Sequence, residues 1–382
     1  MVLVVIVGSP ILWIAFNQKL EPDFFVGVEY AIDNYSVEGC KALVDKVKDY
    51  TNVFIVDTVG ITYDIDNLNE VCDYVYDSGL YFYVFFISLV YQQDDGDYVL
   101  RYNYYPHLWI AEATEKYGEK FLGAYAMDEP GGNQLDDGSF QMVNSAETQS
   151  EAAANFVDLL NRHTSYYSYA SECENIKLLT SEYGLYWYDY KAGYDVVLVE
   201  YAWNHSRPLH TALCRGAANL QHKEWGVMVT WTYNDVPYIV SGDELYADLI
   251  SAYHAGAKYV TVFDHPDTNY SDYGILTEEH FEALENFWNY VKENPTKHGS
   301  LKASAVYVLP ENFGFGFRYA NDQIWGLWSG DTDERTEKIW NDVNSLVEKY
   351  GFSLDIVFSD PEYNDELPWQ YEEVFFWNKK ID

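Results

Sequence analysis

Acidic side chains recur at the ends of apolar runs along this chain. The most distinctive group is Asp128-Glu129-Pro130, which directly follows the apolar run 121–127. Other acidic residues end or follow further apolar runs, namely Glu29, Asp57, Glu182, Glu200, Asp235 and Asp264. Two carboxyl groups that face each other can divide acid–base work, because one keeps a proton to donate while the other attacks or activates water. This pattern predicts the chemistry that cleavage of a glycosidic bond requires.

Aromatic residues accompany these carboxylates at the same run ends. The chain contains 37 Tyr and 12 Trp, and such rings offer an apolar face with a polar tip that suits sugars and protein interfaces. We predict Glu129 as the acid and Asp264 or Glu200 as its partner, with Asp128 beside them. The predicted substrate-binding residues are Glu29, Tyr30, Glu182, Trp203, Trp231 and Tyr233.

Short apolar segments alternate with helical patterns through most of the chain. Eight strands are expected at 24–30, 53–59, 80–89, 121–127, 177–182, 196–201, 226–231 and 259–263. Helices are expected at 37–50, 68–77, 106–117, 147–161, 209–222, 244–255 and 278–293. Eight such strands within about 270 residues predict an α/β fold, a (β/α)8 TIM barrel whose strand ends carry the functional groups. An open doubly wound sheet is the alternative, but no glycine fingerprint follows the first strand.

The last part of the chain has a different pattern. Asn294-Pro295 ends the alternation, and 296–300 reads as a linker. Strands are expected at 303–309, 323–327, 354–358 and 374–377, with a helix at 335–350. We therefore expect an apolar signal or anchor segment at 1–20, the barrel at 21–295 and a small α/β accessory domain at 301–382.

The tripeptide Asp128-Glu129-Pro130 after the fourth strand resembles the Asn-Glu-Pro element of the large clan of (β/α)8-barrel retaining glycoside hydrolases. The resemblance implies that Glu129 is the acid/base and that a second Glu ends strand seven. Here the seventh strand continues as Thr230-Trp231-Thr232-Tyr233 without a Glu, and Asp128 replaces the Asn. The second carboxylate would therefore be Glu200, Asp264, Glu182 or Asp235.

Charge narrows the classes of partner. The formal net charge is −38, which disfavours nucleic acid and anionic lipid and favours a neutral or cationic glycan. No cofactor is expected, because zinc, phosphate-loop and Gly-x-Ser-x-Gly motifs are absent from the sequence. Ca²⁺ remains an alternative at Asp94-Asp95-Gly96-Asp97, which lacks the spacing of an EF-hand, or at the acidic stretch 331–334, which could instead cap a helix.

Several features favour an extracellular or cell-surface protein. The apolar run 2–16 has the length of a signal core and could also anchor the chain in a membrane. Three glycosylation sequons begin at Asn34, Asn204 and Asn269. Cys40 and Cys72 fall on successive predicted helices, and either a disulfide or two buried thiols would fit there. Cys173 and Cys214 have no metal-like spacing.

Two functions follow from these observations. The first is an exported glycoside-hydrolase-like enzyme that uses the carboxylates at the barrel rim. The second is a non-catalytic cell-surface or self-assembling protein that retains the barrel, with homo-oligomers through its tyrosine-rich surface or its apolar N-terminal run. The missing Glu of strand seven motivates the second.

Overall fold

The structure is a computed structural model that describes residues 22–31, 36–92, 97–136, 138, 141–170, 176–265, 268 and 270–381. The predicted segment 1–20, most of the acidic run 94–97, the sequon residues Asn34 and Asn269, and Cys173 lie outside these residues. No helix in the described part of the chain combines the length and the apolar composition needed to cross a membrane.

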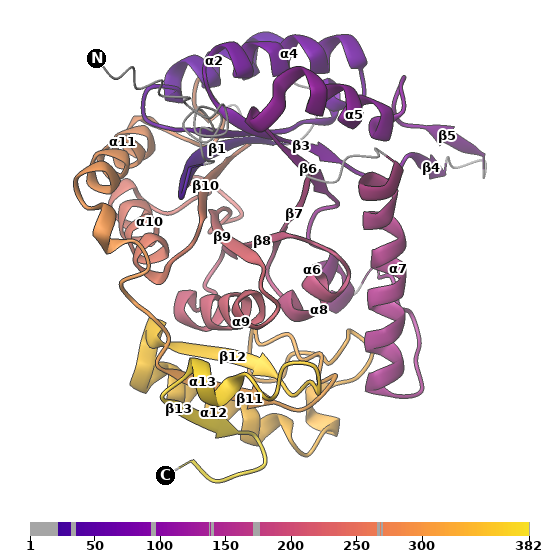
Figure 1. The fold of residues 1–382 in the computed structure, drawn as a ribbon, viewed down its shortest axis with the longest axis vertical. Helices are drawn as coiled ribbons and strands as arrows, with labels where there is room; N and C mark the ends of the chain where they lie inside the picture. Colours follow the sequence, from indigo (N-terminus) through magenta and orange to yellow (C-terminus); the bar gives the residue numbers. More distant parts are fainter. Residues whose placement is uncertain are drawn as a thin grey trace, which may run out of the picture.

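Eight parallel strands close into a barrel, which confirms the predicted fold (Figure 1). Around the barrel the order is β1-β10-β9-β8-β7-β6-β3-β2. The strands are β1 (Phe25–Ala31), β2 (Val53–Asp57), β3 (Tyr81–Phe86), β6 (Phe121–Ala126), β7 (Lys177–Glu182), β8 (Val196–Tyr201), β9 (Glu224–Val229) and β10 (Tyr259–Asp264). Nearly every residue in them is buried, because side chains fill the barrel on one face and meet the helices on the other.

Helices surround the barrel because each has one apolar face (Figure 1). They are α2 (Val37–Val47), α3 (Val59–Thr62), α4 (Ile65–Asp77), α5 (Pro106–Tyr117), α6 (Pro130–Leu135), α7 (Gln149–Ala170), α8 (Tyr186–Lys191), α9 (Arg207–Leu220), α10 (Gly242–Ala255) and α11 (Glu278–Glu293). Some of these helices are capped at their start by a side chain. Ser36 accepts from the Gly39 N–H, and Ser241 forms a capping box with Glu244.

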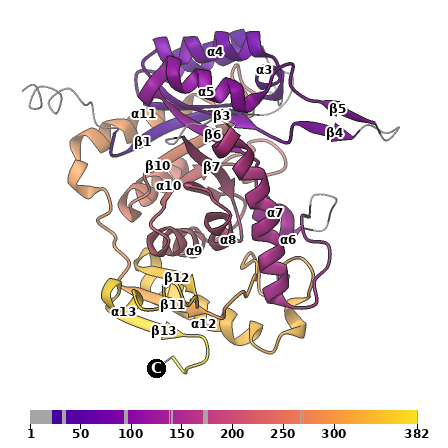
Figure 2. The same ribbon diagram turned by 45° about the vertical axis from the view of Figure 1, so that its right-hand side comes forward.

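Three local differences from the sequence-based expectations concern two short elements and the end of one long helix. Helix α8 was not predicted, because its six residues are mostly aromatic and have no clear helical period. No strand was predicted between 89 and 106, where the structure has a two-stranded antiparallel hairpin, β4 (Val90–Gln92) and β5 (Tyr98–Leu100). This hairpin projects from the body of the molecule beside α5 (Figure 2). Helix α7 extends to Ala170 rather than ending near residue 161.

The C-terminal part forms a small parallel sheet in the order β12-β11-β13, packed beside α9 (Figure 1). Its elements are β11 (Ala305–Leu309), α12 (Thr336–Tyr350), β12 (Leu354–Phe358), α13 (Leu367–Gln370) and β13 (Glu373–Phe376). The strand predicted at 323–327 was wrong. Ile324 makes only isolated bridges to Phe315 and Trp328, because this segment turns back on itself and buries Trp325.

The three cysteines of the described residues are buried free thiols: Cys40, Cys72 and Cys214. Cys40 lies on α2 and Cys72 on α4. Burial raises the pKa of both thiols, so they stay protonated and behave as small apolar side chains. Of the two alternatives for this pair, the structure has the free thiols.

Candidate functional site

Five acidic residues meet at the carboxyl-terminal end of the barrel and are called here the carboxyl cluster. They are Glu29 at the end of β1, Asp57 at the end of β2, Asp128 and Glu129 after β6, and Glu200 near the end of β8. Glu29 is 1% exposed and Glu200 is 5% exposed. Burial raises the pKa of every member, and repulsion by neighbouring carboxylates raises the pKa of Glu29, Asp57, Glu129 and Glu200 further.

Glu129 and Glu200 form the central pair of this cluster. Their carboxyl groups contact each other, and this contact raises the pKa of Glu129 and opposes the raised pKa of Glu200. Burial, and then the charge of Glu200, raise the pKa of Glu129 well above its usual range. Burial, and then the charge of Asp128, raise the pKa of Glu200 to about 8. The pair can therefore hold a transferable proton at neutral pH.

The backbone holds Glu129 in an uncommon conformation. Its φ is 48° and its ψ 46°, the left-handed region, where a residue with a side chain is strained by roughly 1–3 kcal/mol. The Glu129 N–H donates to the carbonyl of Ser181 at 3.2 Å, and Pro130 then begins α6. This turn directs the Glu129 side chain to Glu200 instead of leaving it along the path of β6.

Two hydroxyl groups that sequence reasoning missed connect the cluster. Oγ of Ser181 lies 3.0 Å from Oδ1 of Asp128 and 2.7 Å from Oε1 of Glu200. The Tyr125 hydroxyl lies 2.8 Å from the same Oγ and also donates to Asp128. Both residues are 1% exposed. The sequence signal that could have identified these two residues is the presence of a hydroxyl side chain near the end of an apolar strand.

Glu29 and Asp57 form a second carboxyl pair. Their contact raises the pKa of Glu29 and opposes the raised pKa of Asp57, and the negative charge of Asp128 raises the pKa of both. Burial is the largest cause of the raised pKa of each residue. Glu29 was predicted to bind substrate, and the structure places it inside the cluster. Asp57 ends its strand as expected but had not been chosen as a site residue.

Glu182 was also predicted to bind substrate, but here it organises the backbone. Its carboxylate accepts from the N–H groups of Gly131 at 2.5 Å, Gly132 at 2.7 Å, Tyr183 at 2.8 Å and Gly184 at 3.1 Å. A Cβ on Gly132 would lie 2.2 Å from the Tyr183 ring, so the turn that carries Glu129 requires glycine there. Glu182 therefore fixes the backbone of the turn that carries Glu129.

Asp264 similarly fixes a loop. Its Oδ1 accepts from the N–H groups of Ile275 at 2.9 Å and Leu276 at 3.1 Å. Burial raises the pKa of Asp264 to about 6, although these hydrogen bonds oppose the shift. No hydrogen bond within the described residues joins Asp264 to the cluster. Of the two predicted partners for Glu129, only Glu200 is brought into contact with it.

The predicted aromatic residues lie in different surroundings. Tyr30 is buried, and its hydroxyl group packs against Gly39 of α2. A Cβ atom added to Gly39 would lie 2.6 Å from that hydroxyl. The loops after β8 and β9 are joined by the Trp203 N–H, which donates to the Trp231 carbonyl at 2.6 Å. Trp203 and Tyr233 are 38% and 45% exposed, so their rings are available to a ligand.

The charge of the carboxyl cluster is uncompensated. In the part of the chain that the structure describes, none of its five members forms an ion pair with Lys or Arg. Within the same residues no group of three or more His, Cys, Asp or Glu side chains has the arrangement to hold a metal ion. Protonation of a member lowers the repulsion among such buried carboxyl groups.

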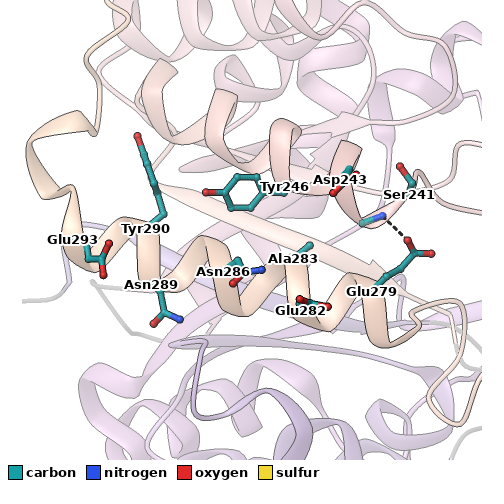
Figure 3. A pocket seen from close by; sticks show the side chains of 11 residues that line it. Ser241, Asp243, Tyr246, Glu279, Glu282, Ala283, Asn286, Asn289, Tyr290 and Glu293 are labelled. Atoms are coloured by element: carbon teal, nitrogen blue, oxygen red, sulfur yellow. Dashed lines mark hydrogen bonds between the residues drawn. The ribbon is translucent and has the colours of Figure 1, made fainter.

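A separate surface groove of about 610 Å³ lies between α10 and α11 (Figure 3). Its lining is acidic and amide-rich, and Glu279 accepts from the Gly242 N–H at its edge. The lining residues are Ser241, Gly242, Asp243, Tyr246, Glu279, Glu282, Ala283, Asn286, Asn289, Tyr290 and Glu293. None of the predicted site residues lines this groove.

Glu29→Gln is expected to flatten the pH dependence of stability. The pKa of Glu29 is raised in the folded state, so its contribution is complete below the unfolded pKa, near 4.3, and is lost as pH rises through the folded pKa. Urea denaturation at pH 6 and pH 9 should show a decline that is smaller in the variant, by up to about 1.4 kcal/mol per pH unit. Exposed Glu115→Gln is the control. An equal decline in wild type and Glu29→Gln would show that Glu29 ionises normally.

No family model matches the chain, and no curated protein matches it. Among solved structures, a family 1 β-glucosidase from Thermotoga maritima is similar, with a TM-score of 0.42, 11% identity, and coverage of 72% of this chain and 99% of the other. A family 5 glycoside hydrolase from Prevotella bryantii has a TM-score of 0.42 and 10% identity over 70% and 96%. A spore coat polysaccharide biosynthesis protein from Bacillus subtilis has a TM-score of 0.39 and 11% identity over 73% and 70%.

Proposed function

We propose that this chain is a glycoside-hydrolase-like protein that cleaves a glycan at the carboxyl cluster. Glu129 is the general acid, and Glu200 is the second carboxyl group. The observation that carries the proposal is the convergence of Glu129, Glu200 and the other members of the carboxyl cluster at the carboxyl end of the barrel. In barrels of this kind catalytic groups sit at that end of the strands. Export to the cell exterior is part of the proposal. Asn204, the first residue of one of the three sequons, is exposed, as a glycosylated asparagine would be.

The chemistry follows from the two protonation states. Glu129 donates its proton to the glycosidic oxygen, so the leaving sugar departs as an alcohol. Glu200, once ionised, attacks the sugar carbon or activates water there. Carboxyl groups lie about 5–5.5 Å apart in retaining enzymes and about 6.5–9.5 Å apart in inverting ones. Because Glu129 and Glu200 are in direct contact, a bound sugar must first separate them.

Activity is expected to fall at acidic pH. A base or nucleophile must be ionised, and the pKa of Glu200 is about 8. Below that value kcat/KM should fall about tenfold for each pH unit, because each unit lowers the ionised fraction tenfold. The measurement is kcat/KM from pH 5 to pH 9 on the best glycan substrate. A flat profile down to pH 5 would exclude Glu200 from this role.

A panel of oligosaccharides tests the proposed function itself. Neutral tetrasaccharides and glucosamine oligomers are incubated with wild type, Glu200→Gln and Glu115→Gln, and new reducing ends are measured. Cleavage of at least one substrate by wild type and Glu115→Gln, with loss in Glu200→Gln, supports the proposal. Equal cleavage by Glu200→Gln would contradict it, as would an absence of cleavage across the panel.

One observation favours the non-catalytic alternative. The ring of Trp369 is 89% exposed, next to the edge strand β13, whose residues are mostly half-buried. Large exposed rings beside a free strand edge are typical of surfaces that contact another chain. Light scattering distinguishes the two cases. An assembly that dissociates in Trp369→Ala would favour a structural protein, whereas a monomer in both forms would count against it.

A further inference from the structure

The Ser181 hydroxyl occupies a central position between two acidic residues of the cluster. Its Oγ is 3.0 Å from Asp128 and 2.7 Å from Glu200, and the Tyr125 hydroxyl approaches the same atom to 2.8 Å. Tyr125 also reaches Asp128, which closes a ring of Tyr125, Ser181 and Asp128 with Glu200 attached to it. All four side chains meet at the carboxyl ends of β6, β7 and β8.

A count of protons shows what this ring requires. It contains four short oxygen–oxygen contacts, but the Tyr125 and Ser181 hydroxyl groups have one proton each. The two hydroxyl protons cannot fill all four contacts at once, and a proton on Asp128 or Glu200 can fill a carboxyl contact that the hydroxyl groups leave empty. Both residues are buried among other acids. Glu200 faces Asp128, Glu129 and Glu182, and Asp128 influences Glu29 and Asp57.

We propose that Ser181 is a positioning residue that passes one proton between Glu200 and Asp128. In the forward step the Ser181 proton moves to Oδ1 of Asp128 while the Glu200 proton moves to Oγ of Ser181. One O–H bond breaks and one forms at each transfer, so Ser181 is unchanged and the net charge is conserved. Glu200 becomes a carboxylate without releasing a proton to solvent.

Tyr125 makes the exchange two-directional. When Asp128 is ionised, the Tyr125 hydroxyl donates to it and stabilises its charge. When Asp128 holds the proton, Tyr125 can donate to Ser181 instead, which leaves the Ser181 proton directed at Glu200. The catalytic role of this proton transfer rests on the proposed function, because the transfer ionises Glu200 while Glu129 keeps its own proton.

The test measures the carboxyl groups directly by ¹³C NMR on protein labelled at Asp and Glu. Titrations from pH 5 to pH 10 are compared for wild type, Ser181→Ala, Ser181→Thr and Tyr125→Phe, with resonances assigned from Asp128→Asn and Glu200→Gln. Thr180→Val is the matched control, because Thr180 lies on the same strand and, among the described residues, its buried hydroxyl donates to the backbone carbonyls of Met127 and Ser181. Circular dichroism verifies that each variant is folded.

In wild type, Asp128 and Glu200 should titrate in two shared steps. Ser181→Ala should raise the Glu200 midpoint by about one pH unit, since one hydrogen bond to the ionised form is lost. Ser181→Thr should restore it, and Thr180→Val should leave it unchanged. Tyr125→Phe should raise the Asp128 midpoint, which tests the ring even if Ser181→Ala fails to fold. If glycan cleavage is found, the acid limb of kcat should move with the Glu200 midpoint at constant KM.

The proposed proton transfer through Ser181, called here the relay, is excluded if Ser181→Ala leaves the Glu200 midpoint unchanged. It is also excluded if Ser181→Thr does not return a shifted midpoint to the wild-type value. These outcomes are separate from the fate of the proposed function. An absence of glycan cleavage together with the expected midpoint shifts would contradict the proposed function and support the relay. Glycan cleavage together with unchanged midpoints would support the proposed function and contradict the relay.

Discussion

Glu129→Gln will slow the cleavage of an unactivated glycan by about 10²–10⁴-fold, the usual contribution of a general acid. Glutamine has the size of glutamate and can still donate to Glu200, but it cannot release a proton to the departing oxygen. The turn that holds Glu129 depends on Glu182 and the glycines after Pro130, so the variant should remain folded. The measurement is kcat on the best oligosaccharide of the panel.

The leaving group separates a lost acid from general damage. An aryl glycoside with an acidic phenol departs without protonation, so Glu129→Gln should lose less than about tenfold on it, well under the usual contribution of a general acid. Glu115→Gln, exposed on α5, should match wild type on both substrates. Equal losses of Glu129→Gln on the glycan and on the aryl glycoside would show that Glu129 is not the acid.

Arg215→Met will lower the free energy of unfolding by about 3–5 kcal/mol, as expected when one partner of a buried ion pair is removed. The Arg215 side chain is 4% exposed, and its Nε donates to Asp355 at 2.7 Å. The guanidinium also donates to the carbonyl groups of Ala255, Leu301, Phe352 and Leu354. It therefore connects α9 of the barrel to β12 of the C-terminal sheet.

Urea denaturation measures this loss, and Arg162→Met provides the comparison. Arg162 pairs with Asp158 on the surface, where the two side chains are 71% and 62% exposed. An exposed pair of this kind contributes about 0–1 kcal/mol. If Arg215→Met costs no more than Arg162→Met, Arg215 does not hold the C-terminal sheet on the barrel.

The barrel could be predicted from the sequence because its strands are continuous apolar runs separated by amphipathic helices. The eight strands lie within a few residues of their expected positions. The failures have local causes. Segment 323–327 is as apolar as a strand, but Ile324 and Trp325 are buried by a turn and not by a ladder. Helix α8 is too short and too aromatic for a helical period to appear.

The end of the barrel at which the carboxyl cluster lies was predictable, but the contacts of individual carboxylates were not. Strand ends identified Glu129, Asp128 and Glu200, which the fold brings together. Glu182 and Asp264 occupy equivalent strand ends, yet they bind backbone N–H groups. That difference depends on how the following loops fold, which strand periodicity does not report. For the same reason the hydroxyl bridge of Ser181 and Tyr125 became visible only when the strands were placed side by side.

The central claim is that Glu129 holds a proton against Glu200 at neutral pH. The most direct measurement is the ¹³C carboxyl resonance of Glu129 between pH 4 and pH 9, assigned by its absence in Glu129→Gln. We expect the shift of a carboxylic acid to persist through pH 7, because burial and Glu200 both raise the pKa of Glu129. A resonance that titrates near the ordinary glutamate value, about 4.3, would contradict the account.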